Sequence, residues 1–257
     1  MLVEDESALR IAVDAADGSA IIALTSDIIL TDSALGIPYG KDITLVSDKP
    51  EGFWKLIGVA DQNTIDVKGK LTIDGIIVTH RKGFGCGVCV NGGGTFFMYS
   101  GEISDNKGVK GDGYGGVYNM GTFVMSGGII SNNTADVDGG GVYNIGGSFV
   151  MSGGKISKNA VLYVTESGSK DDIKGDINAG AGVGGGVSLD YGGIFDLRGG
   201  VIFGNTASNG GGDVHKHGGN LYYFGVRDVV FICMCVALVV VVTAVGVVVL
   251  LLIKRKN

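Results

Sequence analysis

The chain has 257 residues and a formal net charge of −6, and 48 of its residues are glycine while only two are proline. Glycine makes up roughly 19% of the chain against a usual share of about 7%. It follows no G-X-Y period, which excludes collagen, and the scarcity of proline excludes proline-rich disorder. The excess of acidic over basic residues disfavours nucleic acid as a partner, because phosphate backbones are bound by Lys and Arg.

Residues 1–17 predict a short N-terminal capping helix. Leu9, Ala12, Val13 and Ala16 follow helical spacing, and the Asp-Gly pair after them is a typical stop signal. A repeat protein leaves strand edges unpaired at its ends. We therefore expect this amphipathic helix to lie over the first repeat.

A glycine-rich block recurs four times along the chain. Its phenylalanines, Phe96, Phe123, Phe149 and Phe195, are separated by steps of 27, 26 and 46 residues, and the last step equals one repeat plus about 20 inserted residues. An internal period between about 20 and 50 residues is typical of a solenoid. The four copies are GTFFMYSGEISDN (94–106), GTFVMSGGIISNN (121–133), GSFVMSGGKISKN (147–159) and GIFDLRGGVIFGN (193–205).

Each block predicts one coil of a parallel β-helix. In GTFVMSGG, Phe123 and Met125 alternate with Thr122 and Val124, so Phe and Met share the face that points into the core. The glycines allow bends with positive φ, and the Ile-Ile pair and a following GGGVYN block predict two further short strands. Stacked amides can hydrogen-bond from coil to coil, so we expect an asparagine ladder at one corner, formed by Asn106, Asn133, Asn159 and Asn205.

Fainter copies continue the period toward the N-terminus. Leu71 stands 25 residues before Phe96, and Ile43 another 28 before Leu71. We therefore predict an all-β protein in which residues 18–225 form a right-handed parallel β-helix of about seven coils. A β-propeller blade needs about 40 to 50 residues, and a leucine-rich repeat needs a leucine frame that this chain lacks, so both fit worse.

The extra residues before the fourth copy are polar and contain several glycines. They span residues 163–180, with the sequence YVTESGSKDDIKGDINAG. This composition predicts a loop that projects from one coil, and binding loops often take this form. A surface insertion without a function is an equally good interpretation.

Residues 229–253 are 25 consecutive residues without a formal charge, followed by the basic tail 254–257. A helix of this length reaches about 38 Å, enough to cross a hydrocarbon core of about 30 Å, so we predict a C-terminal transmembrane helix. The positive-inside rule places the tail in the cytoplasm and the β-helix outside the cell. The first residues, MLVEDESALR, lack the apolar region of a signal peptide. We expect either a start upstream of Met1, which we favour, or insertion from the tail.

Two stretches resemble a known class of proteins. MSGGIISNNTADVDGGGVYN (125–144) resembles the repeats of adhesin-like proteins, and FGNTASNGGGDV (203–214) resembles the FxxN and GGxI repeats of polymorphic outer-membrane proteins. Both groups are right-handed parallel β-helix surface proteins of the pectin-lyase-like class, and the resemblance covers about residues 18–220. It implies the fold and a surface location but no activity. At its C-terminus the chain departs from the polymorphic family, so autotransport is not implied.

The same class includes lyases and hydrolases of acidic polysaccharides. These enzymes need paired carboxylates, or a calcium-binding carboxylate cluster with a basic residue. Asp171 and Asp172 lie in the insertion, where rigid placement is not expected, and His80 is predicted to be a lone turn residue. Asp196 and Arg198 replace the Val and Gly of other copies, and their alternation predicts a surface ion pair. We therefore assign no catalytic residue.

One cluster has the spacing of a metal site. Asp213, His215 and His217 form D-x-H-x-H, which places three ligands on one face of a strand. Polar decoration of the final coil explains the same residues and is the favoured interpretation. Cys86 and Cys89 have C-x-x-C spacing without a second pair, so drift of the repeat is favoured over zinc or redox chemistry. No cofactor is expected.

The sequence therefore predicts a membrane-anchored cell-surface protein whose β-helix is a non-catalytic, adhesin-like binding or structural module. The expected partners are the membrane and an extracellular glycan or the surface of a host or neighbouring cell. The alternative is a polysaccharide-active lyase or hydrolase. A groove with convergent carboxylates and a Lys or Arg would favour the enzyme, whereas a lateral face of only Ser, Thr, Asn and Gly would favour binding.

Overall fold

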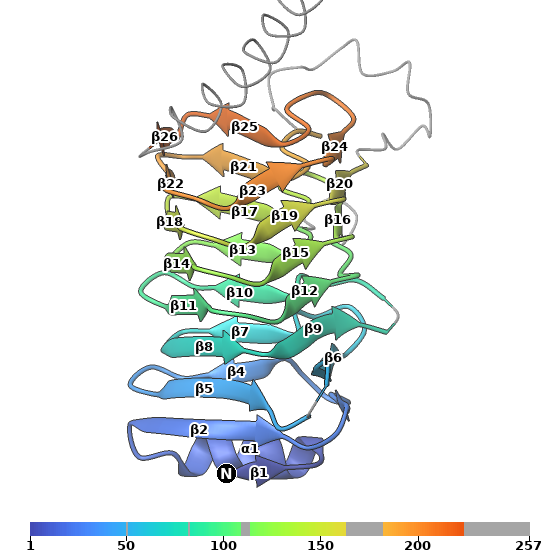
Figure 1. Ribbon diagram of the computed structural model, residues 1–257, viewed down its shortest axis with the longest axis vertical. Coiled ribbons are helices and arrows are strands. Elements are labelled where there is room, and N and C mark those ends of the chain that lie inside the picture. Colours follow the sequence, from blue (N-terminus) through green and yellow to red (C-terminus); the bar gives the residue numbers. More distant parts are fainter. Residues whose placement is uncertain (50, 82, 109–113, 163–181, 224–257) are drawn as a thin grey trace, which may run out of the picture. The chain divides into compact units, whose positions relative to one another are not determined.

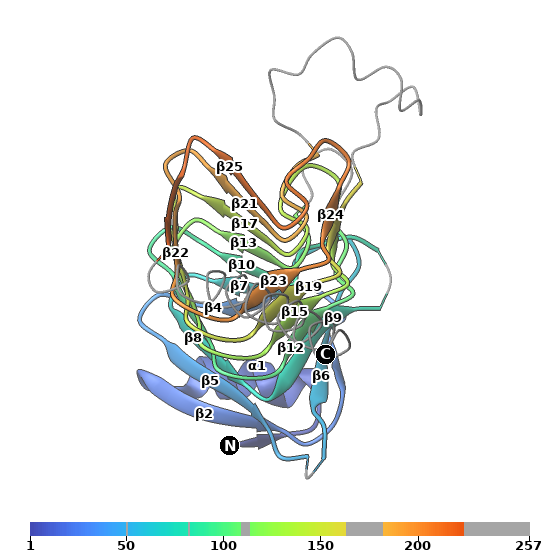
Figure 2. The same cartoon turned by 45° about the horizontal axis from the view of Figure 1, so that its top comes forward.

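Short parallel strands build the structure, and each pairs with the equivalent strand of the next repeat (Figure 1). The computed structural model describes residues 1–49, 51–81, 83–108, 114–162 and 182–223. Within these residues three long sheets form, and each coil contributes one strand to each sheet. When the stack is turned forward, successive coils lie over one another on a common outline (Figure 2). The predicted parallel β-helix of about seven coils is thus confirmed.

Sheet 1 has nine strands, and sheets 2 and 3 have seven each. Sheet 1 comprises β1 (Leu2–Val3), β2 (Ser19–Leu24), β5 (Asp42–Ser47), β8 (Lys70–Asp74), β11 (Thr95–Met98), β14 (Thr122–Met125), β18 (Ser148–Met151), β22 (Ile194–Leu197) and β26 (Asn220–Tyr223). Sheet 2 comprises β3 (Ile28–Ile29), β6 (Trp54–Gly58), β9 (Ile76–His80), β12 (Glu102–Ser104), β15 (Ile129–Ser131), β19 (Lys155–Ser157) and β23 (Val201–Phe203). Sheet 3 comprises β4 (Leu35–Ile37), β7 (Ile65–Val67), β10 (Val88–Val90), β13 (Val117–Asn119), β17 (Val142–Ile145), β21 (Val187–Asp190) and β25 (Val214–His217).

Three coils contain a fourth short strand that the sequence did not predict. Sheet 4 comprises β16 (Thr134–Ala135), β20 (Ala160–Val161) and β24 (Thr206–Ala207). Each of these strands begins directly after an asparagine of the ladder. Thr134 N donates to Asn106 O at 2.9 Å, and Ala160 N donates to Asn133 O at 2.8 Å. Because the ladder fixes the corner of each coil, the two residues after each asparagine take equivalent positions and pair with the same two residues of the next coil.

Like side chains stack on like inside the coils. Phe96, Phe123, Phe149 and Phe195 are fully buried, and the centroids of successive rings are 4.9, 4.6 and 4.5 Å apart. Aromatic contacts add about 0.5–1.5 kcal/mol beyond the burial of their area. The predicted phenylalanine column is therefore confirmed, and it contributes to the adhesion between coils.

The predicted asparagine ladder is also confirmed. The Nδ2 of each member donates to the Oδ1 of the next at 2.8 to 2.9 Å, in the order Asn106, Asn133, Asn159, Asn205. Each of these Oδ1 atoms also accepts the backbone N–H of the preceding asparagine. All four side chains are buried. They satisfy buried polar groups that would otherwise cost about 1–3 kcal/mol each.

The helix α1 (Glu6–Ala15) covers the first coil, as predicted, but it does not begin at the first residue. Leu9, Ala12 and Val13 on its buried face pack into the core of the solenoid, and Asp5 caps its N-terminus by accepting a backbone N–H. The residues before it form β1, which pairs in parallel with β2. The predicted boundary of the helix at residues 1–17 is therefore too wide.

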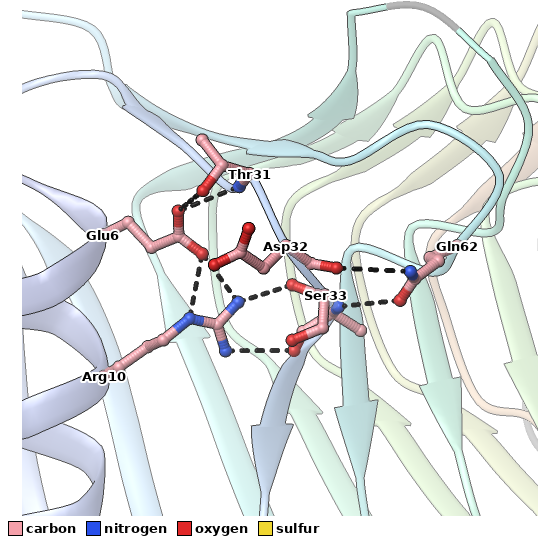
Figure 3. A network of polar contacts seen from close by, with 7 residues as sticks. Glu6, Arg10, Thr31, Asp32, Ser33 and Gln62 are labelled. Carbon is pink, nitrogen blue, oxygen red and sulfur yellow. Dashed lines mark hydrogen bonds and ion pairs between the residues drawn. The ribbon is translucent and has the colours of Figure 1, made fainter.

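Polar side chains of α1 tie the helix to the loop between β3 and β4 (Figure 3). Glu6 Oε2 accepts hydrogen bonds from Thr31 N at 2.9 Å and Thr31 Oγ1 at 2.7 Å. Arg10 forms an ion pair with Glu6 at 2.7 Å and donates to Ala34 O at 3.2 Å. Ala34 N donates in turn to Gln62 Oε1, on the next coil, at 3.3 Å. The network thus joins the helix to the first two coils.

Two predicted features fall outside the described residues. These are the insertion at 163–180 and the apolar run at 229–253 with its basic tail. None of the helices in the described part of the chain has the length and apolar character needed to cross a bilayer. The predicted transmembrane helix at residues 229–253 lies outside the described part of the chain, and it stays a prediction.

Candidate functional site

An open groove of about 380 Å³ lies on the outward face of sheet 1, over the first coils. It is formed by β2, β5 and β8 together with the residue that follows β11. No function was predicted for the residues that line it. They are Ser19, Ala20, Ile21, Asp42, Thr44, Lys70, Thr72, Asp74 and Tyr99.

Two threonines form the floor of the groove. In β8 the alternating residues Leu71 and Ile73 are fully buried in the core, so Thr72 between them faces outward. The register pairs Thr44 with Thr72 on the neighbouring strand, at the usual spacing of about 4.8 Å. Thr72 is only 6% exposed. Two threonine side chains from successive coils are therefore aligned along the stacking direction.

An ion pair lies along one side of the groove. Lys70 Nζ donates to Asp42 Oδ2 at 2.8 Å, and the two residues are paired in register. Both side chains are more than a third exposed, so the pair adds little to stability. Lys70 Nζ also lies 5.4 Å from the centroid of the Phe97 ring. Lys70 therefore neutralises the charge of Asp42 and lies over an aromatic ring.

A carboxylate and a tyrosine lie on the other side. Asp74 Oδ1 accepts a hydrogen bond from Ser100 Oγ at 2.6 Å. Tyr99 directly follows Met98, which pairs with Ile73, so Tyr99 lies beside Asp74, the last residue of β8. Half of the Tyr99 side chain is exposed, which leaves an aromatic surface available at this edge of the groove.

The two carboxylates of the groove are too far apart to act as a pair. Asp42 is in register with Lys70, and Asp74 lies four residues further along β8. At about 3.3 Å per residue and about 4.8 Å between strands, their Cα atoms are about 14 Å apart. The carboxyl groups of glycoside hydrolases lie about 5–9.5 Å apart. The groove therefore has the residue types of an enzyme without that spacing.

The predicted ion pair between Asp196 and Arg198 is confirmed. Arg198 Nη2 lies 2.6 Å from Asp196 Oδ2, and Nε donates to the same oxygen at 2.8 Å. The register places Asp196 beside Val150, on the outward face of sheet 1. The pair differs from an ordinary surface pair because Asp196 is 9% exposed. Its Oδ1 is buried without a hydrogen-bond partner among the described residues.

The predicted metal candidates Asp213, His215 and His217 have different roles. Asp213 Oδ1 accepts from Asn205 Nδ2 at 2.9 Å and from Asn205 N at 3.0 Å, so it ends the asparagine ladder. His215 and His217 lie on β25, where burial lowers the pKa of His215. Among the described residues, no group of three or more His, Cys, Asp and Glu side chains is arranged to hold a metal ion.

Cys86 and Cys89 are both buried and carry free thiols. Cys86 Sγ donates to Asn63 Oδ1 at 3.1 Å. The pKa of Cys86 is raised well above its usual value, mainly by a hydrogen bond with Cys89 and to a lesser extent by burial. A thiol in this state is a poor nucleophile. In register, Cys89 pairs with Tyr118, which agrees with the prediction that the motif is a drifted repeat.

His80 is buried at the end of β9, so its prediction as a turn residue was wrong. Its Nδ1 lies 2.9 Å from Asn106 Oδ1, and its Nε2 lies 2.7 Å from Gln62 O. A Cβ atom on Gly58 would lie 2.5 Å from His80 Nε2, so glycine is needed there to admit the ring. His80 thus occupies the N-terminal end of the asparagine ladder.

A stack of tyrosines covers part of sheet 3. The ring of Tyr114 stacks on Tyr118 and Tyr143, with centroids 4.3 and 4.6 Å apart. Tyr143 Oη donates to Asp190 Oδ2 at 3.0 Å, and burial and the Asp190 charge raise the pKa of Tyr143. Nearby, burial raises the pKa of Asp138 to about 6. Tyr143 and Asp190 thus bind each other, whereas Asp138 accepts the backbone N–H of Val183.

No family model, curated protein or solved structure matches this chain. The parallel β-helix is established by its own strand register. The resemblance of the repeats to pectin-lyase-like surface proteins stays a prediction.

The groove was missed because it lies on the coils where the repeat is faint. Its residues are spread from Ser19 to Tyr99, and the partners of its ion pair, Asp42 and Lys70, are 28 positions apart in the sequence. A signal was present in the alternation of polar and apolar residues in 42–46 and 70–74. Aligning these two stretches would have placed Thr44 beside Thr72 and Asp42 beside Lys70.

Proposed function

We propose that this chain is a membrane-anchored surface protein whose β-helix binds a linear glycan, without catalysis, in the groove of sheet 1. The observation that carries the proposal is the alignment of Thr44 and Thr72 on successive coils, in a groove that is also lined by an exposed tyrosine and an ion pair. Hydroxyl and carboxylate groups bind sugar hydroxyls by hydrogen bonds. The exposed ring of Tyr99 offers an apolar surface to a sugar face.

The dimensions of the groove support a linear ligand. From β2 to β11 there are three strand steps, or about 14 Å along the stacking direction. A pyranose unit is similar in length to one strand step, so successive sugars can meet equivalent positions of successive coils. The repeat of the solenoid thereby provides a periodic surface for a periodic polymer. The prediction of a pectin-lyase-like, right-handed surface protein agrees with such a partner.

A polysaccharide-active enzyme is the second candidate. It is favoured by the presence of Asp42, Asp74 and Lys70 in one groove, which is the composition expected of an enzyme site. It is disfavoured by the separation of about 14 Å between the two aspartate Cα atoms. The ion pair of Lys70 with Asp42 also occupies the one lysine of the groove.

Binding and turnover can be separated with one set of samples. The full-length protein in detergent is tested for retention on immobilised linear glycans, and the same glycans are assayed for cleavage products. We expect retention without products. Tyr99→Ala should lower the affinity about tenfold, because stacking on an aromatic ring is lost. Tyr39→Ala, which removes an exposed tyrosine outside the groove, serves as the control. Release of shorter glycans would favour the enzyme.

The membrane anchor is the remaining part of the proposal, and it depends on residues 229–253 alone. A lysine at the centre of a membrane helix costs about 2.5–3.5 kcal/mol. Replacing Val241 and Val245 together with lysine should therefore move the protein from the membrane pellet to the supernatant after carbonate extraction. Val241→Leu with Val245→Leu is the matched control. Retention of the double lysine variant in the pellet would contradict a single-span anchor.

A further inference from the structure

We propose that Asp74 and Tyr99 form an ammonium-binding site at one edge of the groove. The groove then selects glycans that carry free amino groups over neutral and uronate glycans. This inference rests on the proposed glycan-binding function and specifies the class of glycan.

The charges of the groove favour a cationic ligand. Three charged side chains line it, and two of them, Asp42 and Lys70, neutralise each other at 2.8 Å. Asp74 makes no salt bridge within the described part of the chain, and it accepts a hydrogen bond from the neutral hydroxyl of Ser100. One negative charge is therefore left for a ligand at this edge.

The position of Tyr99 adds a second feature that recognises an ammonium group. Asp74 ends β8 and Tyr99 directly follows β11, the neighbouring strand, and both line the same groove. An ammonium group attached to a sugar can hydrogen-bond the Asp74 carboxylate while it lies against the face of the ring. Charge-assisted hydrogen bonds are stronger than neutral ones, and a cation over an aromatic ring is attracted by the ring quadrupole.

The same arrangement disfavours uronate polymers. A sugar carboxylate at this edge would face Asp74, and like charges repel. The only lysine of the groove is already held by Asp42 and lies over the Phe97 ring. A uronate would have to break that ion pair to gain a cationic partner. The groove thus differs from sites that bind acidic polysaccharides.

Paired glycans test the inference. The full-length protein in detergent is titrated with a β-1,4-linked glucosamine hexamer, its N-acetylated counterpart and a uronate hexamer of similar length. We expect the free-amine hexamer to bind about tenfold more tightly than the acetylated one, and the uronate to bind most weakly. The preference for the free amine should shrink when the salt concentration is raised from about 0.05 M to about 0.5 M, because salt screens the attraction between exposed charges.

Two variants separate the site from the rest of the groove. Asp74→Asn should abolish the preference for the free amine while the acetylated hexamer still binds. Glu102→Gln is the matched control, since Glu102 also accepts a hydrogen bond from a serine of a neighbouring coil, Ser131, but lies on sheet 2. This control should leave the preference unchanged.

The outcomes distinguish the inference from the function on which it rests. If no linear glycan binds, the proposed function is wrong and the inference falls with it. If the acetylated hexamer binds as tightly as the free amine, or Asp74→Asn keeps the preference, the inference alone is wrong. Preferred binding of the uronate would also overturn it.

Discussion

Asp138 is a buried carboxylate that joins two parts of the chain separated by the insertion. Its Oδ1 accepts the backbone N–H of Val183 at 3.0 Å, and its side chain is 7% exposed. Burial raises its pKa to about 6. The folded protein therefore favours the neutral form of this group, whereas an unfolded aspartate ionises near pH 4.

Replacing Asp138 with asparagine should stabilise the protein at neutral pH. Because the folded-state pKa is raised, the folded state binds more protons between about pH 4 and pH 6, and the free energy of unfolding falls as the pH rises through that window. Asp138→Asn keeps an acceptor for Val183 N without the charge. We expect a gain of about 1–2 kcal/mol at pH 7 and little change at pH 4. Thermal unfolding at both pH values measures this, and equal gains would contradict it.

Asp196 offers a second test at the residue scale. The same column of sheet 1 holds Val124 and Val150, so Asp196→Val restores the residue that the repeat predicts. The variant removes a buried oxygen without a partner in the described residues, and the lost ion pair involves an exposed arginine. We expect stabilisation of about 1 kcal/mol, measured by thermal unfolding. Asp196→Ser, which stays polar, is the control, and a less stable valine variant would contradict the argument.

Sequence reasoning at the residue scale succeeded where the repeat supplied several copies of a position. The Phe column and the Asp196–Arg198 pair followed from comparing copies. It failed for His80, because the coils around it have drifted and nothing local shows that Asn106 lies beside it. A hydrogen bond between residues 26 positions apart becomes predictable only when the coil length is known.

The asparagine ladder is the element that fixes one corner of every coil from Asn106 onward. Asn133 Oδ1 accepts from both the N and the Nδ2 of Asn106, and Asn133 Nδ2 donates to Asn159 Oδ1. His80 and Asp213 occupy its two ends. The ladder is therefore a continuous chain of buried hydrogen bonds across the stack.

Breaking the ladder in the middle should cost far more than changing the residue beside it. Asn133→Ala leaves the buried backbone N–H of Asn106 without its acceptor and removes the hydrogen bonds that Asn133 Nδ2 donates to Asn159 Oδ1 and Ile103 O, so we expect a loss of about 3 kcal/mol. Asn132→Gly is the control, because Asn132 is exposed and has a positive φ of 56° that glycine adopts readily. Chemical denaturation compares the two. A loss below about 1 kcal/mol for Asn133→Ala would show that the ladder relaxes around the gap.

Elements were predicted well wherever the glycine-rich block is clear and less well elsewhere. The strands at Phe96, Phe123 and Phe149 were predicted from the block alone. Sheet 4 was missed because its strands are two residues long and carry no period of their own. They exist because the ladder orients the backbone that follows it, which is a tertiary effect.

Without α1 and β1, the first coil of the solenoid would present unpaired strand edges. The helix buries Leu9, Ala12 and Val13 against the core, and its polar face is joined to the first coil through Glu6 and Arg10 (Figure 3). An uncovered edge is a template for pairing with another chain. The cap therefore bears on solubility as well as on stability.

Disrupting the cap should cause self-association. Leu9→Asp places a charge in the core, and we expect α1 to detach, with a loss of about 4 kcal/mol and the appearance of oligomers at micromolar concentration. Ile11→Asp is the matched control on the same helix, because Ile11 is 64% exposed while Leu9 is fully buried. Size-exclusion chromatography with light scattering distinguishes the two. A monomeric Leu9→Asp protein would show that the edge needs no cover.

The amino-acid sequence is sufficient to predict the coil. Its period, its stacked phenylalanines, its asparagine ladder and its N-terminal cap all follow from side chains that recur at fixed spacing, because parallel stacking brings each residue beside its own copy. The groove, the position of His80 and the ends of the ladder are known only from the folded chain. These depend on contacts between residues that have no copies, such as Asp42 with Lys70, and for such residues the register has to be known before neighbours can be named.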